Sequence, residues 1–130
     1  MERQPPQWLE VGDGPSKRRL AYLLQEGTGA PVVWLGGFRS DMRATKAEAL
    51  AEWAQANGRA CLRFDYGGHG ESDGAFGSFN LSDWLADAIA AIESQCRQPA
   101  ILVGSSMGGW IALLAARKLF GSALQPADRK

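Results

Sequence analysis

The chain has 130 residues, 45% of them hydrophobic and 22% charged, which is the composition of one ordinary globular domain. Its 14 Lys and Arg residues balance its 14 Asp and Glu residues, so no charge excess favours nucleic acid or an anionic membrane as a partner. No apolar run approaches the roughly 20 residues of a membrane span, and the first residues lack the apolar stretch of a secretory leader. We therefore expect a cytoplasmic protein in which Cys61 and Cys96 stay reduced.

Short apolar runs between glycine-rich joints predict the first three strands. Residues 8–11 and 19–24 are separated by turn residues, which indicates an antiparallel hairpin. Residues 31–35 form a continuous apolar run, which is typical of a strand buried on both faces, and Gly36-Gly37 end it.

Helices and strands alternate in the rest of the chain. Helical spacing of apolar residues predicts helices over 46–57, 81–94 and 110–120, with strands over 60–64 and 100–103. Alternation with short joints implies parallel strands, right-handed crossovers and helices on both faces of the sheet. The predicted fold class is therefore α/β, a mostly parallel sheet with an antiparallel N-terminal hairpin. Ligands of such sheets bind at the carboxyl ends of the strands.

Ser106 is the centre of a G-x-S-x-G pattern that runs from Gly104 to Gly108. A strand is predicted before it and a helical pattern begins near Met107, the context in which a serine occupies a sharp turn with its hydroxyl exposed. We expect Gly104 and Gly108 to avoid collisions in this turn, and Gly109 to let the helix approach the sheet. Ser106 is the candidate nucleophile; the alternative is a glycine-rich turn with a structural serine.

A serine nucleophile also needs N–H donors for the oxyanion that forms during acyl transfer. One donor is expected from the backbone of Met107, directly after the serine, and the other from the turn that follows residues 31–35. In that turn the N–H of Phe38 is the candidate, and Gly37 would let the turn fold over the site. The alternative is an ordinary loop whose glycines only permit a tight turn.

A third glycine-rich turn follows the predicted strand at residues 60–64. We interpret it as structural, because side chains such as Asp65 and Ser72 hold turns by bonding to backbone groups. His69 lies inside this turn and before Ser106, so we do not expect it to be the catalytic base. The glycine spacing does not match a dinucleotide fingerprint, and no metal site or cofactor is predicted. The residues assigned to the structural turn are Asp65, Gly67, Gly68, His69, Gly70 and Ser72.

The segments 34–38, 63–72 and 102–110 together resemble the oxyanion turn, the glycine turn and the nucleophile turn of the α/β-hydrolase superfamily. The resemblance covers roughly residues 18–120. It looks most like the branch that contains the mitochondrial acyl-protein thioesterase, which also cleaves acyl glucuronides, and its bacterial relatives. It implies a serine hydrolase that acts on small-molecule carboxylic esters or thioesters without a metal or organic cofactor.

The resemblance also implies an acid and a histidine after the serine, in that order. No histidine follows Ser106, and Asp128 is the only acid beyond it. We therefore expect residues 1–130 to be an incomplete α/β-hydrolase domain, its N-terminal half, with a core at about 18–120 and a polar tail at 121–130. Both a truncated gene product and an incomplete sequence fit this expectation, and the chain alone is expected to be weak or inactive.

Two other functions fit the same residues, a non-catalytic fragment that serves as an interaction module and a half-enzyme completed by a second chain. The strand at 100–103 would leave an unpaired apolar edge, which favours association. We therefore expect self-association or complementation through this sheet edge.

Overall fold

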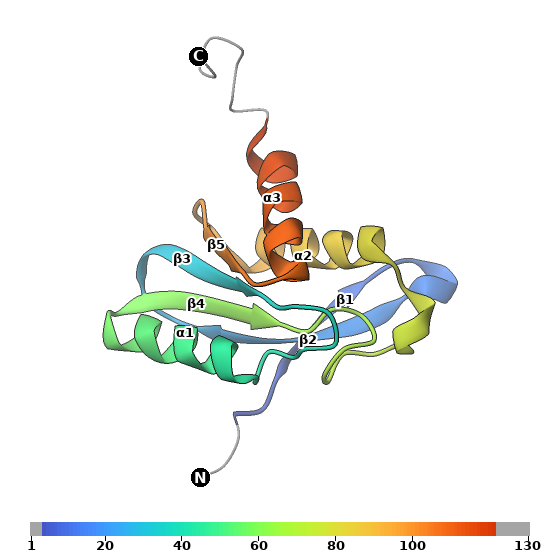
Figure 1. Ribbon diagram of the computed structural model, residues 1–130, viewed down its shortest axis with the longest axis horizontal. Coiled ribbons are helices and arrows are strands. Elements are labelled where there is room, and N and C mark those ends of the chain that lie inside the picture. The colour runs from blue at the N-terminus through green and yellow to red at the C-terminus, as the bar shows by residue number, and fades with distance from the viewer. Residues whose placement is uncertain (1–3, 122–130) are drawn as a thin grey trace.

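The computed structural model describes residues 4–121. They form a mixed five-stranded sheet with helices on both faces (Figure 1). The strands are β1 (Gln7–Val11), β2 (Arg18–Gln25), β3 (Thr28–Leu35), β4 (Arg59–Phe64) and β5 (Ile101–Gly104). The helices are α1 (Thr45–Ala56), α2 (Leu81–Gln95) and α3 (Met107–Phe120), with short 3-10 helices at Gly14–Ser16 and Phe76–Ser78. Apart from Gly121, the predicted tail at 121–130, with Asp128 in it, lies outside the described residues.

The strand order is β1-β2-β4-β3-β5. β1 and β2 form the predicted antiparallel hairpin, in which Gln7 pairs with Tyr22. β2 also runs antiparallel to β4, whereas β3 runs parallel to both β4 and β5. The predicted α/β fold with an antiparallel hairpin is confirmed, and the antiparallel part extends one strand pairing beyond the hairpin itself.

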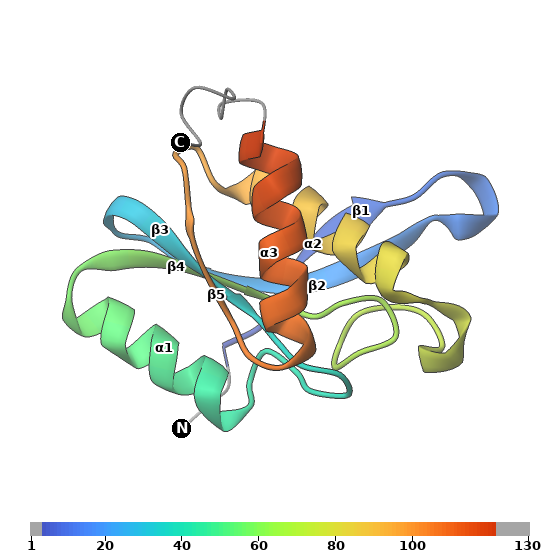
Figure 2. The ribbon, with the colours of Figure 1, turned by 45° about the horizontal axis from the view of Figure 1, so that its top comes forward.

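Both faces of β3 and β4 are covered, which explains why β3 reads as a continuous apolar run. Successive side chains of a strand point to opposite faces. Val33 and Leu35 accordingly join the core under α2 and α3, and Val32 joins the smaller core under α1. Figures 1 and 2 show α1 on one side of the sheet and the other two helices on the opposite side.

The edge strand β5 runs beside α3 (Figure 2). Within residues 4–121, β3 is its only strand partner, so one edge of β5 is open. Apolar side chains are exposed there, with Ile101 at 47% and Leu113 at 74%. A groove of about 430 Å³ follows the two elements and is lined by Ala100, Leu102, Gly104, Gly109, Ala112, Leu113, Ala116 and Phe120.

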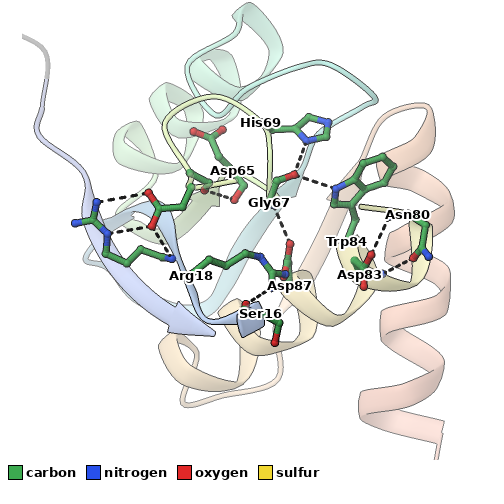
Figure 3. A network of polar contacts seen from close by, with 12 residues as sticks. Ser16, Arg18, Asp65, Gly67, His69, Asn80, Asp83, Trp84 and Asp87 are labelled. Carbon is green, nitrogen blue, oxygen red and sulfur yellow. Dashed lines mark hydrogen bonds and ion pairs between the residues drawn. The ribbon is translucent and has the colours of Figure 1, made fainter. Parts of the chain in front are cut away.

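Helix α2 begins at a capping box, and this start directs two of its side chains toward the glycine-rich turn that follows β4 (residues 65–74, the glycine turn). The Asn80 side chain accepts a hydrogen bond from Asp83 N–H at 3.0 Å, and the Asp83 carboxylate accepts one from Asn80 N–H at 2.9 Å (Figure 3). Such a box satisfies helix N–H groups that have no partner within the helix. Trp84 and Asp87 follow three positions apart, so both face the same side of the helix.

Candidate functional site

Ser106 lies at the junction of β5 and α3, where its backbone adopts φ 58° and ψ −124°. A positive φ is disfavoured for a residue with a Cβ, and such strain costs roughly 1–3 kcal/mol. Ser106 is the N-cap of α3, yet its side chain makes no capping hydrogen bond. The side-chain oxygen of a serine at an N-cap usually accepts a hydrogen bond from a helix N–H group. Here the hydroxyl is not engaged by the helix, and the residue is exposed.

Two glycines beside Ser106 have the steric role that the sequence suggested, and a third does not. A Cβ on Gly104 would overlap the carbonyl oxygen of Gly108, and a Cβ on Gly108 would overlap that of Leu35. Our expectation for Gly109 is wrong. A Cβ there would lie 3.7 Å from its nearest neighbour, the carbonyl oxygen of Gly104, which is an ordinary contact. The close approach of α3 to the sheet is therefore at Gly108.

The β3–α1 turn (residues 36–42) lies against this junction. A Cβ on Gly37 would be 3.6 Å from the Cβ of Ser106, and Ser105 N–H donates to the carbonyl oxygen of Leu35 at 3.3 Å. Phe38 follows Gly37 directly. Met107 is the first residue of α3, where N–H groups have no partner within the helix. The two predicted oxyanion donors thus belong to the two segments that meet at Ser106.

Arg39 is a special residue of the β3–α1 turn that the sequence analysis missed. Ser40 N–H donates to Gly37 O at 3.1 Å, which closes a four-residue turn, and Arg39 is its third residue with φ 62°. A positive φ at that place is the mark of a type II turn, in which glycine is the usual occupant. The strain is invisible in the sequence because arginine carries no signal of positive φ.

Two buried side chains of the glycine turn (residues 65–74) make hydrogen bonds to the backbone of the β3–α1 turn. Tyr66 Oη donates to Gly36 O at 3.0 Å, and His69 Nε2 accepts the N–H of Arg39 at 3.2 Å. His69 is only 4% exposed, and its Nδ1 lies 3.1 Å from Gly67 O. Both imidazole nitrogens are therefore engaged by backbone groups, so His69 has no free nitrogen to offer Ser106.

Asp65 ties the two turns together at a third point. Its carboxylate accepts N–H groups of Met42 at 2.8 Å and Glu71 at 2.9 Å. Burial raises the pKa of Asp65 to about 6, although these two N–H donors act in the opposite direction. Ser72 extends the connection, since its hydroxyl donates to Asp65 O at 2.6 Å and accepts Ala21 N–H at 2.8 Å.

Gly67 is the centre of the polar network drawn in Figure 3. Its N–H donates to the Asp87 carboxylate at 2.8 Å, and its carbonyl oxygen accepts Trp84 Nε1–H at 3.0 Å. Asp87 also pairs with Arg18 at 2.5 Å, and the Asp87 side chain is almost fully buried. Burial raises the pKa of Asp87, while Gly67 N–H and Arg18 lower it. Helix α2 is thereby fixed to the glycine turn.

A cavity of about 350 Å³ lies between the two turns and is lined by Arg39, Ser40, Asp41, Gly68, His69, Gly70 and Phe76. Gly68 and Gly70 adopt φ 73° and 47°, conformations that glycine takes without strain. The Arg39 guanidinium lies over the Phe76 ring, 4.8 Å from its centroid. The wall of this cavity therefore combines a cation with an aromatic face.

Within residues 4–121, no helix is both long and apolar enough to cross a membrane. No group of three or more His, Cys, Asp and Glu side chains is gathered there in a way that could hold a metal ion.

Comparison with known proteins decides the family. The model of the family described as serine aminopeptidase, S33 (Hydrolase_4) matches residues 28–122. The chain belongs to this family of α/β hydrolases. The resemblance predicted from the three glycine-rich segments is thereby confirmed.

Relatives of this α/β hydrolase include mitochondrial thioesterases. It is 41% identical over 102 residues to the human palmitoyl-protein thioesterase ABHD10, mitochondrial, which is 78% of this chain and 33% of that protein. It is similar to the crystal structure of a protein from Agrobacterium vitis S4 described as a hydrolase, with a TM-score of 0.86, 41% identity and coverage of 92% and 47%. For mouse alpha/beta hydrolase domain-containing protein 10 the TM-score is 0.81 at 33% identity, with coverage of 88% and 45%. The chain spans a third of the human relative and about half of the two solved chains.

The comparisons also correct the expected cellular location. The curated thioesterase relatives are mitochondrial by name, and they point to mitochondria rather than the cytoplasm. The cytoplasmic location expected from composition is therefore wrong, because composition does not encode a cellular address.

Proposed function

We propose that this α/β hydrolase carries the nucleophile and the oxyanion-binding part of a serine hydrolase that acts on carboxylic esters or thioesters. One observation carries the proposal. Ser106 is held at φ 58° between β5 and α3, with a hydroxyl that caps no helix N–H group. The resemblance to human palmitoyl-protein thioesterase ABHD10 supports the same class of substrate.

In the proposed reaction, Ser106 Oγ attacks the carbonyl carbon of the acyl group. The π electrons of the carbonyl move to its oxygen, and the N–H groups of Phe38 and Met107 stabilise the resulting oxyanion. Removing one such donor costs about 3 kcal/mol of transition-state stabilisation in a well-studied hydrolase. The tetrahedral intermediate then collapses, the C–O or C–S bond breaks, and the leaving oxygen or sulfur takes up the proton that Ser106 gave to the base, so that an alcohol or thiol departs. Water attacks the acyl-serine in the second half of the reaction, which releases the carboxylic acid and restores the Ser106 hydroxyl.

The proton of Ser106 needs an acceptor, and the one histidine of the sequence is not suited to the task. His69 Nε2 accepts the N–H of Arg39 and its Nδ1 faces Gly67 O. We infer that the chain by itself is a weak hydrolase or none, and that full activity depends on a base from a further segment or chain. The alternative is a non-catalytic interaction module that retains the fold.

A fluorophosphonate probe tests the proposal, because it phosphonylates activated serines. The chain is incubated with the probe and analysed by intact mass and peptide mapping. Because the chain lacks a suitable base for the Ser106 proton, we expect slow labelling at Ser106. Ser106→Ala should abolish it and Ser105→Ala should retain it, since Ser105 is the matched neighbouring serine, whose hydroxyl accepts a hydrogen bond from Lys46. Hydrolysis of a short-chain thioester and its oxygen ester is measured in parallel. No labelling of the folded chain, even at high probe concentration and after long incubation, would favour the non-catalytic alternative.

A further inference from the structure

We propose that His69 is a positioning residue for the oxyanion donor of the β3–α1 turn. Its imidazole bridges Gly67 O and Arg39 N–H, and this bridge fixes the peptide that follows Phe38. The positioning of Phe38 N–H for catalysis rests on the proposed function. The bridge itself does not, and it can be measured in the folded chain.

The chemistry of the two neighbours fixes the state of the ring. A carbonyl oxygen can only accept, so Nδ1 must carry the proton that faces Gly67 O at 3.1 Å. A backbone N–H can only donate, so Nε2 must offer a lone pair to Arg39 N–H at 3.2 Å. Both contacts select one state, a neutral imidazole with its proton on Nδ1. This is a single tautomer assigned from two independent partners.

The ring has little freedom to leave this position. His69 is buried, and its centroid lies 5.1 Å from Trp84, 5.2 Å from Phe76 and 5.5 Å from Tyr66. Trp84 Nε1–H donates to the same carbonyl oxygen of Gly67. This oxygen therefore accepts two hydrogen bonds, one from Trp84 and one from His69, and both of its acceptor positions are used (Figure 3). The bridge is therefore supported by packing and by a second donor on the same anchor.

Arg39 needs such support. With φ 62° it occupies a conformation that favours glycine, and its N–H points to His69 in that conformation. Rotation of the peptide between Phe38 and Arg39 would relieve the positive φ, but it would also withdraw the N–H from Nε2. The hydrogen bond thus stabilises the strained form of the turn against its relaxed form.

The other two ties hold different parts of the turn. Tyr66 binds the carbonyl oxygen of Gly36 at its start, and Asp65 binds the N–H of Met42 at its end. His69 holds the middle, next to Phe38. Loss of the imidazole would therefore leave the ends of the turn in place and release its centre, which separates positioning from a general role in folding.

NMR of the uniformly ¹⁵N-labelled chain gives the direct test, and the single histidine makes its imidazole signals unambiguous. We expect a protonated Nδ1, a pyridine-type Nε2 and slow hydrogen exchange at Arg39 N–H. In His69→Gln the amide oxygen reaches about as far as Nε2, so Arg39 N–H stays protected. In His69→Phe the ring fills the same space without an acceptor, and protection falls at least about tenfold while the chain still melts cooperatively; His69→Leu replaces it if His69→Phe does not fold. A proton on Nε2 in the wild type, or equal protection in the two variants, would overturn the proposal.

Labelling by the fluorophosphonate probe separates this proposal from the proposed function. We expect His69→Phe to label Ser106 about ten- to a hundredfold more slowly than His69→Gln, because an ångström of misplacement can cost about a hundredfold. Equal rates in the two variants would refute positioning and leave the nucleophile intact. If the wild type does not label at all, the proposed function fails, and the NMR result alone decides the role of His69.

Discussion

Replacing Gly108 with alanine, with Gly109→Ala as its control, tests whether α3 needs its close contact with the sheet. The two glycines are neighbours in the first turn of the same helix. A Cβ at Gly108 would overlap Leu35 O and lie 2.6 Å from Gly36 O, whereas one at Gly109 would make only an ordinary contact at 3.7 Å. The two variants add the same methyl group and differ only in what it meets.

The two substitutions are expected to change the free energy of unfolding in opposite directions. Gly109→Ala should stabilise the chain by about 0.5–1 kcal/mol, which is the difference in helix propensity. Gly108→Ala gains the same propensity, but backbone oxygens cannot swing aside as a side chain can. The contact with Gly36 O alone must lengthen to 3.4 Å before it is ordinary. Overpacking of this kind costs about 1–3 kcal/mol or more. Because the propensity gain is common to both variants, we expect their free energies of unfolding to differ by this overpacking cost.

Urea denaturation followed by tryptophan fluorescence measures this difference, since the chain has five tryptophans. In a domain of this size about 1 kcal/mol corresponds to roughly 4 °C, so thermal melts should separate the variants by roughly 4–12 °C or more. The rate at which the probe labels Ser106 should also fall in Gly108→Ala, because the displaced helix α3 begins at Met107, directly after Ser106. Equal stability of the two variants would refute the idea that Gly108 sets the approach of α3 to β3.

Three further outcomes are expected. Since burial raises the pKa of Asp65 to about 6 from 3.8, the folded chain binds a proton more tightly than the unfolded chain. The contribution of Asp65 to stability should then fall by roughly 3 kcal/mol as the pH rises from about 4 to 6. In urea titrations at each pH, Asp65→Asn should remove this contribution, whereas the fall due to Asp87, whose pKa burial also raises, should remain. Arg18→Met should cost about 3–5 kcal/mol by leaving Asp87 buried without its cation, and Asp87→Asn in the same chain should recover much of that loss; equal stability of single and double variants would count against the pair. We propose that the chain self-associates through the open edge of β5, so Ile101→Lys should reduce the sedimentation coefficient at high concentration while Trp53→Lys on α1 should not; a monomeric wild type at every concentration would contradict this.

Helices and strands that have a recognisable local residue pattern could be predicted from the sequence. The pairing of strands that are distant in the sequence could not. β3 was predicted because a strand with two covered faces needs apolar residues at every position, as Val32 and Val33 show. The antiparallel pairing of β2 with β4 joins Tyr22 to Phe64. Nothing in either segment names its partner, since any exposed strand edge offers the same backbone groups.

The candidate site divides in the same way. The position of Ser106 between strand and helix could be predicted because G-x-S-x-G is contiguous and each of its neighbours has its own local pattern. The positive φ of Arg39 could not, since it depends on an acceptor thirty residues further along the chain. Gly109 was misjudged for a related reason: a glycine beside a close contact looks the same in sequence as the glycine that makes it.

The backbone of Ser106 has a consequence for how this chain would change over generations. The chain uses glycine at 16 positions, seven of which adopt positive φ, but at residue 106 it accepts the same kind of angle with a side chain present. The resulting strain, roughly 1–3 kcal/mol, is a sizeable part of the 5–15 kcal/mol that holds a typical domain together. Random substitution would find glycine at this position as a stabilising change. A lineage without use for the hydroxyl would therefore drift toward it, and serine persists only where something selects for its oxygen.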